Sequence, residues 1–276
     1  MTAQTRDSYP LGRSQAETER LMWSARQMQV SIRSFLEEAG VEPGMKVLDV
    51  GSGAGDIAFL AAEVVGPAGS VTGIDLNDTI LDTARKRASE SGAGNVRFVT
   101  ARIPDDLRSL DNDYDAIIGR RVLCYIPEPA KALEALLKHA RSGAIVAFQE
   151  IDWTIWAQHS FPLAPYYEQV WGLIYRAFLA GGTDMSMGTG LYAIFLDAGL
   201  PEPLMKAEAG VGSPMAGLPF TMNLLRSTRE TIIREGIAPA EDVDPDVVEQ
   251  RLRAEYAELR TVVTGGFEVR AWARKP

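Results

Sequence analysis

The sequence predicts an α/β fold, in which a mostly parallel sheet of seven strands carries helices on both faces, with helical cap and lid elements added. Short segments rich in β-branched residues alternate with helical segments over residues 46–149. Such alternation is typical of βαβ units, whose right-handed crossovers produce a parallel sheet covered on both sides. A glycine-rich turn, Gly51 to Gly55, follows the first predicted strand. This is the position where folds of this class bind ligands.

The N-terminal segment predicts a helical cap over residues 1–39. Ser14 and Glu17 have the spacing of a capping box, in which a hydroxyl and a carboxylate bond the first amides of a helix. An apolar stripe then recurs at spacings of four and three residues, as expected for one helix face that ends near Gly40. The stripe consists of Leu21, Ala25, Met28, Ile32 and Phe35.

The following segment, residues 40–152, is predicted to be the core. Five strands are expected at 47–50, 71–75, 96–100, 114–118 and 144–149, with helices between them.

Residues 153–276 are predicted to hold the lid, at about 153–200 and 215–262, and the last core strands. Helices are expected at 160–180 and 188–199, and strands at about 203–212 and 266–274. Asp244 followed by Pro245 is a good N-cap and first-turn pair for one more helix.

Composition excludes several classes of protein. The chain has 276 residues and a formal charge of −9, which disfavours broad binding to nucleic acid or anionic lipid. One cysteine and two histidines leave no intramolecular disulfide and little for a metal site. No apolar run is long enough to span a bilayer, and the first residues lack the apolar stretch of a signal peptide. We therefore expect a cytoplasmic protein without metal, membrane or nucleic-acid partner.

The glycine loop predicts a ligand that approaches the backbone closely. Gly51, Gly53 and Gly55 allow a sharp turn, and the amides that open the next helix face the ligand. Asp56 occupies the last position of a dinucleotide fingerprint, where its charge would repel a pyrophosphate. The loop thus favours a cationic or zwitterionic ligand. Two alternatives stay open: the loop serves only helix packing, or Asp56 is an ordinary first-turn acid that favours the helix dipole.

A second signal is Asp75, at the end of the second predicted strand and 24 residues after Gly51. A carboxylate fixed at a strand end can accept both hydroxyls of a ribose. Leu76, beside it, offers an apolar surface to an adenine. The sequence therefore predicts that a nucleoside-bearing ligand binds here.

Five segments carry a family resemblance in their order and spacing: VLDVGSGAGD, VTGIDLND, NVRFVTARIPDDL, YDAIIGRRVLCYIPEP and AIVAFQEID. Over about residues 40–150 the chain resembles the class I S-adenosylmethionine-dependent methyltransferases, and more narrowly their small-molecule group of the ubiquinone/menaquinone-biosynthesis type. The resemblance implies a Rossmann-like sheet with an antiparallel last strand, and S-adenosyl-L-methionine as cofactor. It implies that Asp49 and the amides of Gly51, Ser52 and Gly53 hold the methionine part, that Asp75 and Leu76 contact ribose and adenine, and that Arg120 lies beside the cofactor.

One departure concerns the adenine. The family commonly has Gly-Asp-Ala after its third strand, and the acid reads the adenine amino group; this chain has Ala101, Arg102 and Ile103. Adenine contact then falls to backbone atoms of Ala101 and Arg102, or to Asp105.

Methyl transfer is an in-line displacement, which a protein accelerates by holding donor and acceptor together in a dry site. A base is needed only where the acceptor carries a proton. Glu150 and Asp152, two residues apart at the end of the fifth strand, lie on one face and are candidates for that base. His159 is another. The alternatives are that both carboxylates accept loop amides and that His159 is an ordinary loop residue. Cys124 is expected to be a packing residue.

The predicted lid is rich in aromatic residues, with eight of the chain's 22 in residues 153–178. Most are expected in the core, and a minority to line an apolar pocket. The sequence therefore predicts a methyltransferase of an apolar or aromatic small-molecule metabolite, with an O, N or C acceptor. A cofactor-binding protein of this fold that does not methylate is the alternative, and an RNA methyltransferase is disfavoured. The sequence does not decide between a monomer and a homodimer.

Overall fold

The computed structural model describes residues 28–155 and 158–276; Ser14, Glu17, Leu21 and Ala25 of the predicted cap lie outside these residues. The chain divides into two compact units. The sheet unit comprises described residues 28–151, 187–207 and 268–276. The helical unit comprises described residues 152–155, 158–186 and 208–267.

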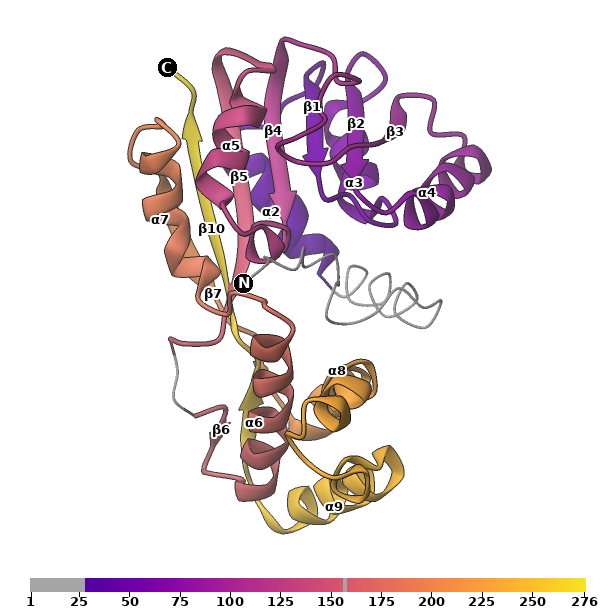
Figure 1. Cartoon of the computed structure of the whole chain (residues 1–276), viewed down its shortest axis with the longest axis vertical. Helices are drawn as coiled ribbons and strands as arrows, with labels where there is room; N and C mark the ends of the chain where they lie inside the picture. Colours follow the sequence, from indigo (N-terminus) through magenta and orange to yellow (C-terminus); the bar gives the residue numbers. More distant parts are fainter. Residues whose placement is uncertain (1–27, 156–157) are drawn as a thin grey trace, which may run out of the picture. The chain divides into compact units, whose positions relative to one another are not determined.

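The sheet unit is built on seven strands in the order β3-β2-β1-β4-β5-β10-β7 (Figure 1). Neighbours from β3 to β5 pair in parallel. The strands are β1 (Lys46–Val50), β2 (Ser70–Asp75), β3 (Val96–Thr100), β4 (Tyr114–Arg120), β5 (Ala140–Asp152), β7 (Leu204–Glu208) and β10 (Phe267–Arg274). This confirms the predicted seven-stranded, mostly parallel sheet.

The last strand, β10, runs opposite to β5, as the resemblance implies (Figure 1). Near the start of β5, the amide of Gly143 donates to the Lys275 carbonyl, and the Lys275 amide donates to the Ala144 carbonyl. At its other end, Glu268 of β10 contacts Arg120, the last residue of β4. The end of β10 therefore lies beside the start of β5.

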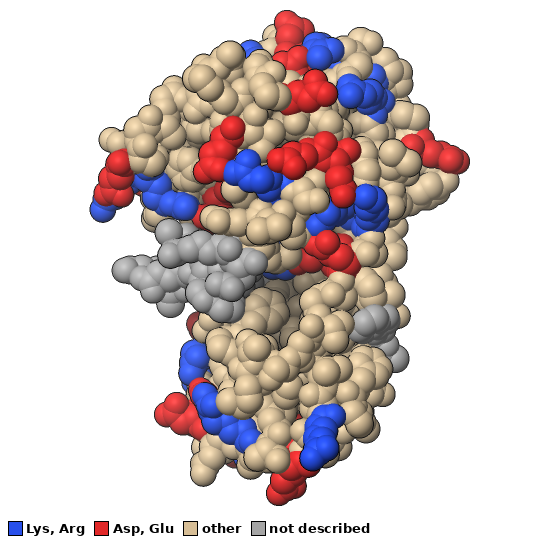
Figure 2. Space-filling view, turned by 180° about the vertical axis from the view of Figure 1, so that it is seen from behind, with Lys and Arg blue, Asp and Glu red and all other residues tan. Residues whose placement is uncertain are grey.

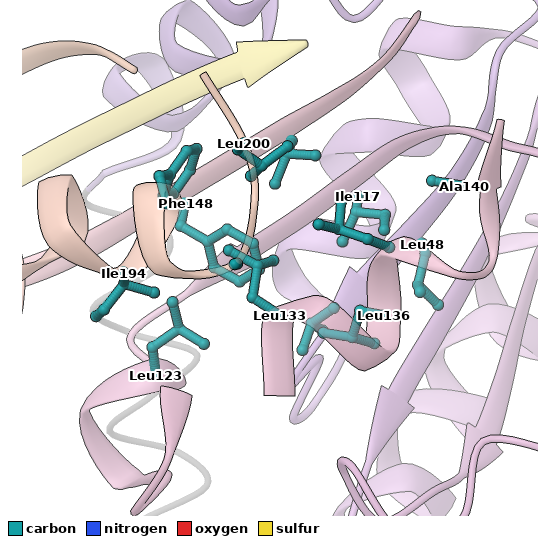
Figure 3. Packing of buried hydrophobic residues seen from close by; sticks show 14 of the residues in the cluster. Leu48, Ile117, Leu123, Leu133, Leu136, Ala140, Phe148, Ile194 and Leu200 are labelled. Carbon is teal, nitrogen blue, oxygen red and sulfur yellow. The ribbon is translucent and has the colours of Figure 1, made fainter. Parts of the chain in front are cut away.

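Helices cover both faces of this sheet because successive strand residues point to opposite sides. On one face, α2 (Gln29–Ala39), α3 (Asp56–Val65) and α4 (Asp78–Ser91) pack against residues such as Val47 and Ile118. On the other, α5 (Pro129–Leu137) and α7 (Met187–Asp197), with the 3₁₀ turn η1 (Leu123–Tyr125), pack against neighbouring strand residues. Figure 3 shows this second core, which includes Leu48, Ile117, Phe148 and Ile194. Both faces of the sheet therefore carry a buried apolar core.

The helical unit contains α6 (Pro165–Ala180), α8 (Pro214–Arg234), α9 (Pro245–Glu258) and the short helix η2 (Ala240–Val243). A small antiparallel sheet joins β6 (Ser160–Phe161), β9 (Val262–Thr264) and β8 (Val211–Gly212). The interior of the helical unit is aromatic. The Trp153 ring contacts those of Trp171 and Phe178 edge-on, and its centroid lies 4.5 Å from the first and 5.4 Å from the second. Most of the lid aromatics that the structure describes therefore form core.

Two elements differ from the predicted boundaries. α7, expected in the lid, belongs to the sheet unit because Met187, Leu191 and Phe195 pack into its core. The strand expected over 203–212 is two strands: β7 joins the large sheet, and β8 joins the small one. Among the described residues, no helix has the length and apolar character needed to cross a membrane.

Candidate functional site

The glycine loop between β1 and α3 is shaped by left-handed backbone at three positions. Gly51, Gly53 and Gly55 have φ angles of 68°, 53° and 88°, which side chains other than glycine rarely adopt. Gly55 is the N-cap residue of α3. The amide of Ser52 donates to the Ile74 carbonyl at 2.8 Å, which ties the loop to the end of β2. The loop therefore presents backbone at the carboxyl edge of the sheet, as predicted.

Asp49, the next-to-last residue of β1, is a buried carboxylate with unmet hydrogen-bonding capacity. Only 1% of it is exposed, and neither carboxylate oxygen has a hydrogen-bond partner among the described residues. Burial, reinforced by the charge of Asp75, raises its pKa well above the usual value, although the Ala58 amide lies close enough to lower it in part. The buried Ser52 hydroxyl also has no hydrogen-bond partner among the residues that the structure describes. Because orphaned buried polar groups are costly, this pair suits a ligand that brings donors or a positive charge.

Asp75 ends β2 beside the same loop. One carboxylate oxygen accepts from the Gly53 amide at 3.0 Å, and the other accepts from the Asn77 amide at 2.8 Å. The two amides hold the carboxylate in the fixed orientation that a bidentate contact with a diol requires.

The two residues that flank Asp75, Leu76 in sequence and Ala101 on the neighbouring strand end, differ in their exposure to solvent. Leu76 is 42% exposed although it is apolar. Ala101 is buried, and its amide donates to the Asp75 carbonyl at 3.0 Å. Arg102 is exposed, and its carbonyl accepts from the Asp106 amide. An exposed leucine beside a fixed carboxylate provides a surface for a flat apolar group.

Arg120, predicted to lie beside the cofactor, forms a buried polar cluster. Its guanidinium donates to the Gln149 side-chain oxygen at 3.2 Å and to the Glu268 carboxylate at 3.3 Å. Burial and the neighbouring Arg121 charge lower its pKa to about 10. Glu268 also pairs with Arg121, and these two arginines hold its pKa below the usual range despite burial. Gln149 and Glu268 were not among the predicted site residues, because they lie 29 and 148 residues from Arg120 and no local pattern links them to it.

Glu150 is fully buried in β5. One carboxylate oxygen accepts from the amides of Val122 and Leu123 at 2.9 and 2.8 Å. The other oxygen has no hydrogen bond of good geometry among the described residues, but the thiol and amide of Cys124 lie close enough to lower the pKa of the carboxyl. Burial raises the pKa of Glu150 to about 7.

Asp152 and His159 belong to the helical unit. The Asp152 carboxylate accepts from the Thr154 amide and hydroxyl at 2.8 and 2.6 Å. The His159 ring stacks on Trp171 at 5.6 Å, and its Nδ1 lies 3.5 Å from the Glu168 carboxylate. Each thus has local contacts that organise its own loop. The residues that the structure brings together around the glycine loop are Asp49, Gly51, Ser52, Gly53 and Asp75.

Asp56, the first residue of α3, forms an ion pair with Arg87 at 2.8 Å. This contact fits the alternative of an ordinary first-turn acid. No group of three His, Cys, Asp or Glu side chains in the described ranges is arranged to hold a metal ion. Figure 2 shows Lys and Arg interspersed with Asp and Glu on the face in view, without a continuous basic band.

The chain is similar to known methyltransferases. A family model described as a methyltransferase domain matches residues 41–180. The ubiquinone/menaquinone biosynthesis C-methyltransferase UbiE of Ectopseudomonas mendocina is 37% identical over 112 residues, which are 40% of this chain and 43% of that protein. The arsenite methyltransferase of Halobacterium salinarum is 34% identical over 113 residues, 41% of this chain and 29% of that protein. The chain thus spans less than half the length of these relatives.

Solved structures of two proteins share the fold. A SAM-dependent methyltransferase from Aquifex aeolicus has a TM-score of 0.54 and 23% identity, with 69% of this chain and 90% of that chain covered. The [4+2]-cyclase SpnF has a TM-score of 0.53 and 21% identity, with 90% and 81% covered. At this identity the likeness shows the fold alone.

Proposed function

This chain belongs to the methyltransferase domain family, and on that premise we propose that it is an S-adenosylmethionine-dependent enzyme that moves a methyl group to an apolar or aromatic small molecule. The observation that carries the proposal is the buried carboxylate of Asp49, which lacks a partner among the described residues beside the glycine loop. A ligand with an ammonium group and a positively charged sulfur supplies the donor and the charge that this carboxylate suits.

The residues at the loop have distinct proposed roles. Asp49 and Ser52, with the amides of Gly51 and Gly53, hold the methionine part of the cofactor. Asp75 accepts the ribose hydroxyls, for which its two amide contacts already orient it. When bound, the cofactor supplies an electrophilic methyl group.

The adenine would lie on Leu76, which directly follows Asp75 and has an exposed apolar side chain. The backbone of Ala101 and Arg102 would take the place of the acid that the family uses. Arg120, held by Glu268 and Gln149, would contribute positive potential beside the cofactor rather than a direct charge contact.

The acceptor is proposed to be apolar or aromatic because the helical unit concentrates such side chains. Trp153 and Trp171 form its core, while Phe161 and Met215 are 44% and 45% exposed. Catalysis would consist mainly of excluding water and holding the acceptor in line with the methyl group. For an acceptor that carries a proton, Glu150, Asp152 and His159 are the proposed candidates for the base.

A protein of this fold that binds the cofactor without methylating is the second candidate. It is favoured by the Ala101-Arg102-Ile103 sequence where the family has an acid. Titration calorimetry with S-adenosylmethionine and S-adenosylhomocysteine tests both candidates, since each requires binding. If neither compound bound to the protein, both candidate functions would be refuted.

A second experiment separates the two candidates. The protein is incubated with a metabolite extract and S-adenosylmethionine that carries a labelled methyl group, and the products are analysed by mass spectrometry. The first candidate predicts a labelled small molecule that is absent without the protein. Binding without any labelled product would favour the second.

A further inference from the structure

Glu150 caps the turn that follows β4. Its carboxylate is fully buried, and a single oxygen, Oε1, accepts from the amides of both Val122 and Leu123. Those amides open the 3₁₀ turn η1 (Leu123–Tyr125), where backbone donors have no partner inside the helix. One side-chain oxygen from the neighbouring strand β5 therefore satisfies the start of this turn.

The same turn is packed directly against the glycine loop. Val122 fills the space beside Gly51, where an added Cβ atom would lie 2.5 Å from one of its methyl groups, and its other methyl group lies 3.1 Å from the place of a Cβ on Gly119, whose space is filled mainly by Phe148. Just before it, Arg121 has a φ angle of 50°, a left-handed conformation that costs energy in a residue with a side chain. In this turn Val122 packs directly against the backbone of Gly51.

We propose that Glu150 is a positioning residue, which holds the turn after β4 and, through Val122, keeps the glycine loop in the conformation that binds the cofactor. The identity of the ligand rests on the proposed function; the support of the loop does not. This role removes Glu150 from the candidates for the general base and leaves Asp152 and His159.

The contacts define what the role requires of the side chain. Oε1 needs only its lone pairs and the reach of a glutamate, because both partners are neutral amide donors. Glutamine offers an oxygen at the same reach without the charge, whereas aspartate keeps the charge but is one methylene shorter. Burial raises the pKa of Glu150 to about 7, although the two amide donors lower it. A general base requires the opposite ranking, with aspartate the better substitute.

The test compares Glu150→Gln, Glu150→Asp and Glu150→Leu in the full chain. Affinity for S-adenosylhomocysteine is measured by calorimetry, and amide hydrogen exchange over residues 119–126 by mass spectrometry without ligand. We expect E150Q to bind within threefold of the wild type and to keep its slow exchange. E150D and E150L should bind at least tenfold more weakly and exchange at least tenfold faster. As a control, Glu134→Leu, at an exposed position of α5, should change neither.

Two results would overturn the proposal: an E150D variant that matches the wild type while E150Q loses affinity, or an E150L variant with unchanged exchange and affinity. If E150L does not fold, the ranking of E150Q and E150D still decides. A wild-type protein that binds neither S-adenosylmethionine nor S-adenosylhomocysteine would refute the proposed function, while the exchange measurement would still test the support of the turn by Glu150.

Discussion

Three carboxylates differ in how many of their oxygens accept hydrogen bonds from the described residues. This difference distinguishes a carboxylate that stabilises the fold from one that is available to a ligand. In the helical unit, Glu255 of α9 accepts from the Tyr166 and Tyr167 amides, one with each oxygen, at 2.8 and 3.0 Å. In the sheet unit, Glu150 has one oxygen satisfied, and Asp49 has neither. Since folded chains rarely leave buried polar groups unpaired, the unsatisfied group marks where a ligand is expected, and the satisfied one marks a structural cap.

The largest effect that we expect concerns the half-satisfied group, Glu150. Its pKa of about 7 in the folded protein lies above the usual value of 4.5, so the folded state holds the proton more tightly. The stability that this contributes is complete below pH 4.5 and is lost as the pH rises through 7. The difference in unfolding free energy between the wild type and E150Q should fall by about 3 kcal/mol over this range.

Chemical denaturation at several pH values measures this difference. Other titrating groups cancel between the two proteins, and the nearby Arg120 and Cys124 keep their protonation state in this window, since burial raises the pKa of the thiol and that of Arg120 stays at about 10. A difference that does not change with pH would mean that Glu150 does not titrate in this range.

The second effect tests the ligand side of the comparison. Asp75→Ala should weaken binding of S-adenosylhomocysteine by about a hundredfold, roughly 2.7 kcal/mol, because it removes the ribose contact and frees the Gly53 and Asn77 amides. Calorimetry measures it, and Asp78→Ala, which changes an exposed acid three residues later, is the matched control. Equal affinity of Asp75→Ala and the wild type would refute the ribose assignment.

The third effect tests the architectural side. Glu255→Ala leaves two amides at the start of α6 without their acceptor, and should lower the unfolding free energy by about 1–2 kcal/mol. Because Glu255 is a cap and not a ligand group, cofactor affinity should stay the same. Glu258→Ala, exposed in the same helix, should change neither quantity. Loss of affinity in Glu255→Ala without loss of stability would contradict the assignment of this carboxylate to architecture.

The sequence predicts what depends on local pattern. The strands that precede the glycine loop and Asp75 follow from short apolar segments bounded by glycine or aspartate, and the structure contains them within a residue or two. Contacts between distant segments leave no such pattern. The pairing of Arg120 with Glu268 and the capping of α6 by Glu255 connect residues 148 and 89 positions apart. The assignment of α7 to the sheet unit likewise could not be predicted, because its apolar face alone does not show which of the two units it packs against.

The substitution with the smallest expected effect, Asp49→Asn, tests the contrast between Asp49 and Glu255 most sharply. It should change cofactor affinity and protein stability in opposite directions. Asp49→Asn keeps the shape of the side chain but removes the charge that a cationic ligand would meet, so S-adenosylhomocysteine should bind about tenfold more weakly, roughly 1.4 kcal/mol. Without ligand, the same change removes a buried carboxyl whose pKa is raised in the folded protein, a shift that lowers stability at high pH, and it should therefore raise the unfolding free energy at pH 8 by about 1 kcal/mol. Calorimetry and denaturation at pH 8 measure the two quantities. An Asp49→Asn protein that loses stability together with affinity would show that Asp49 stabilises the fold, and the distinction drawn from Glu255 would then fail at this residue.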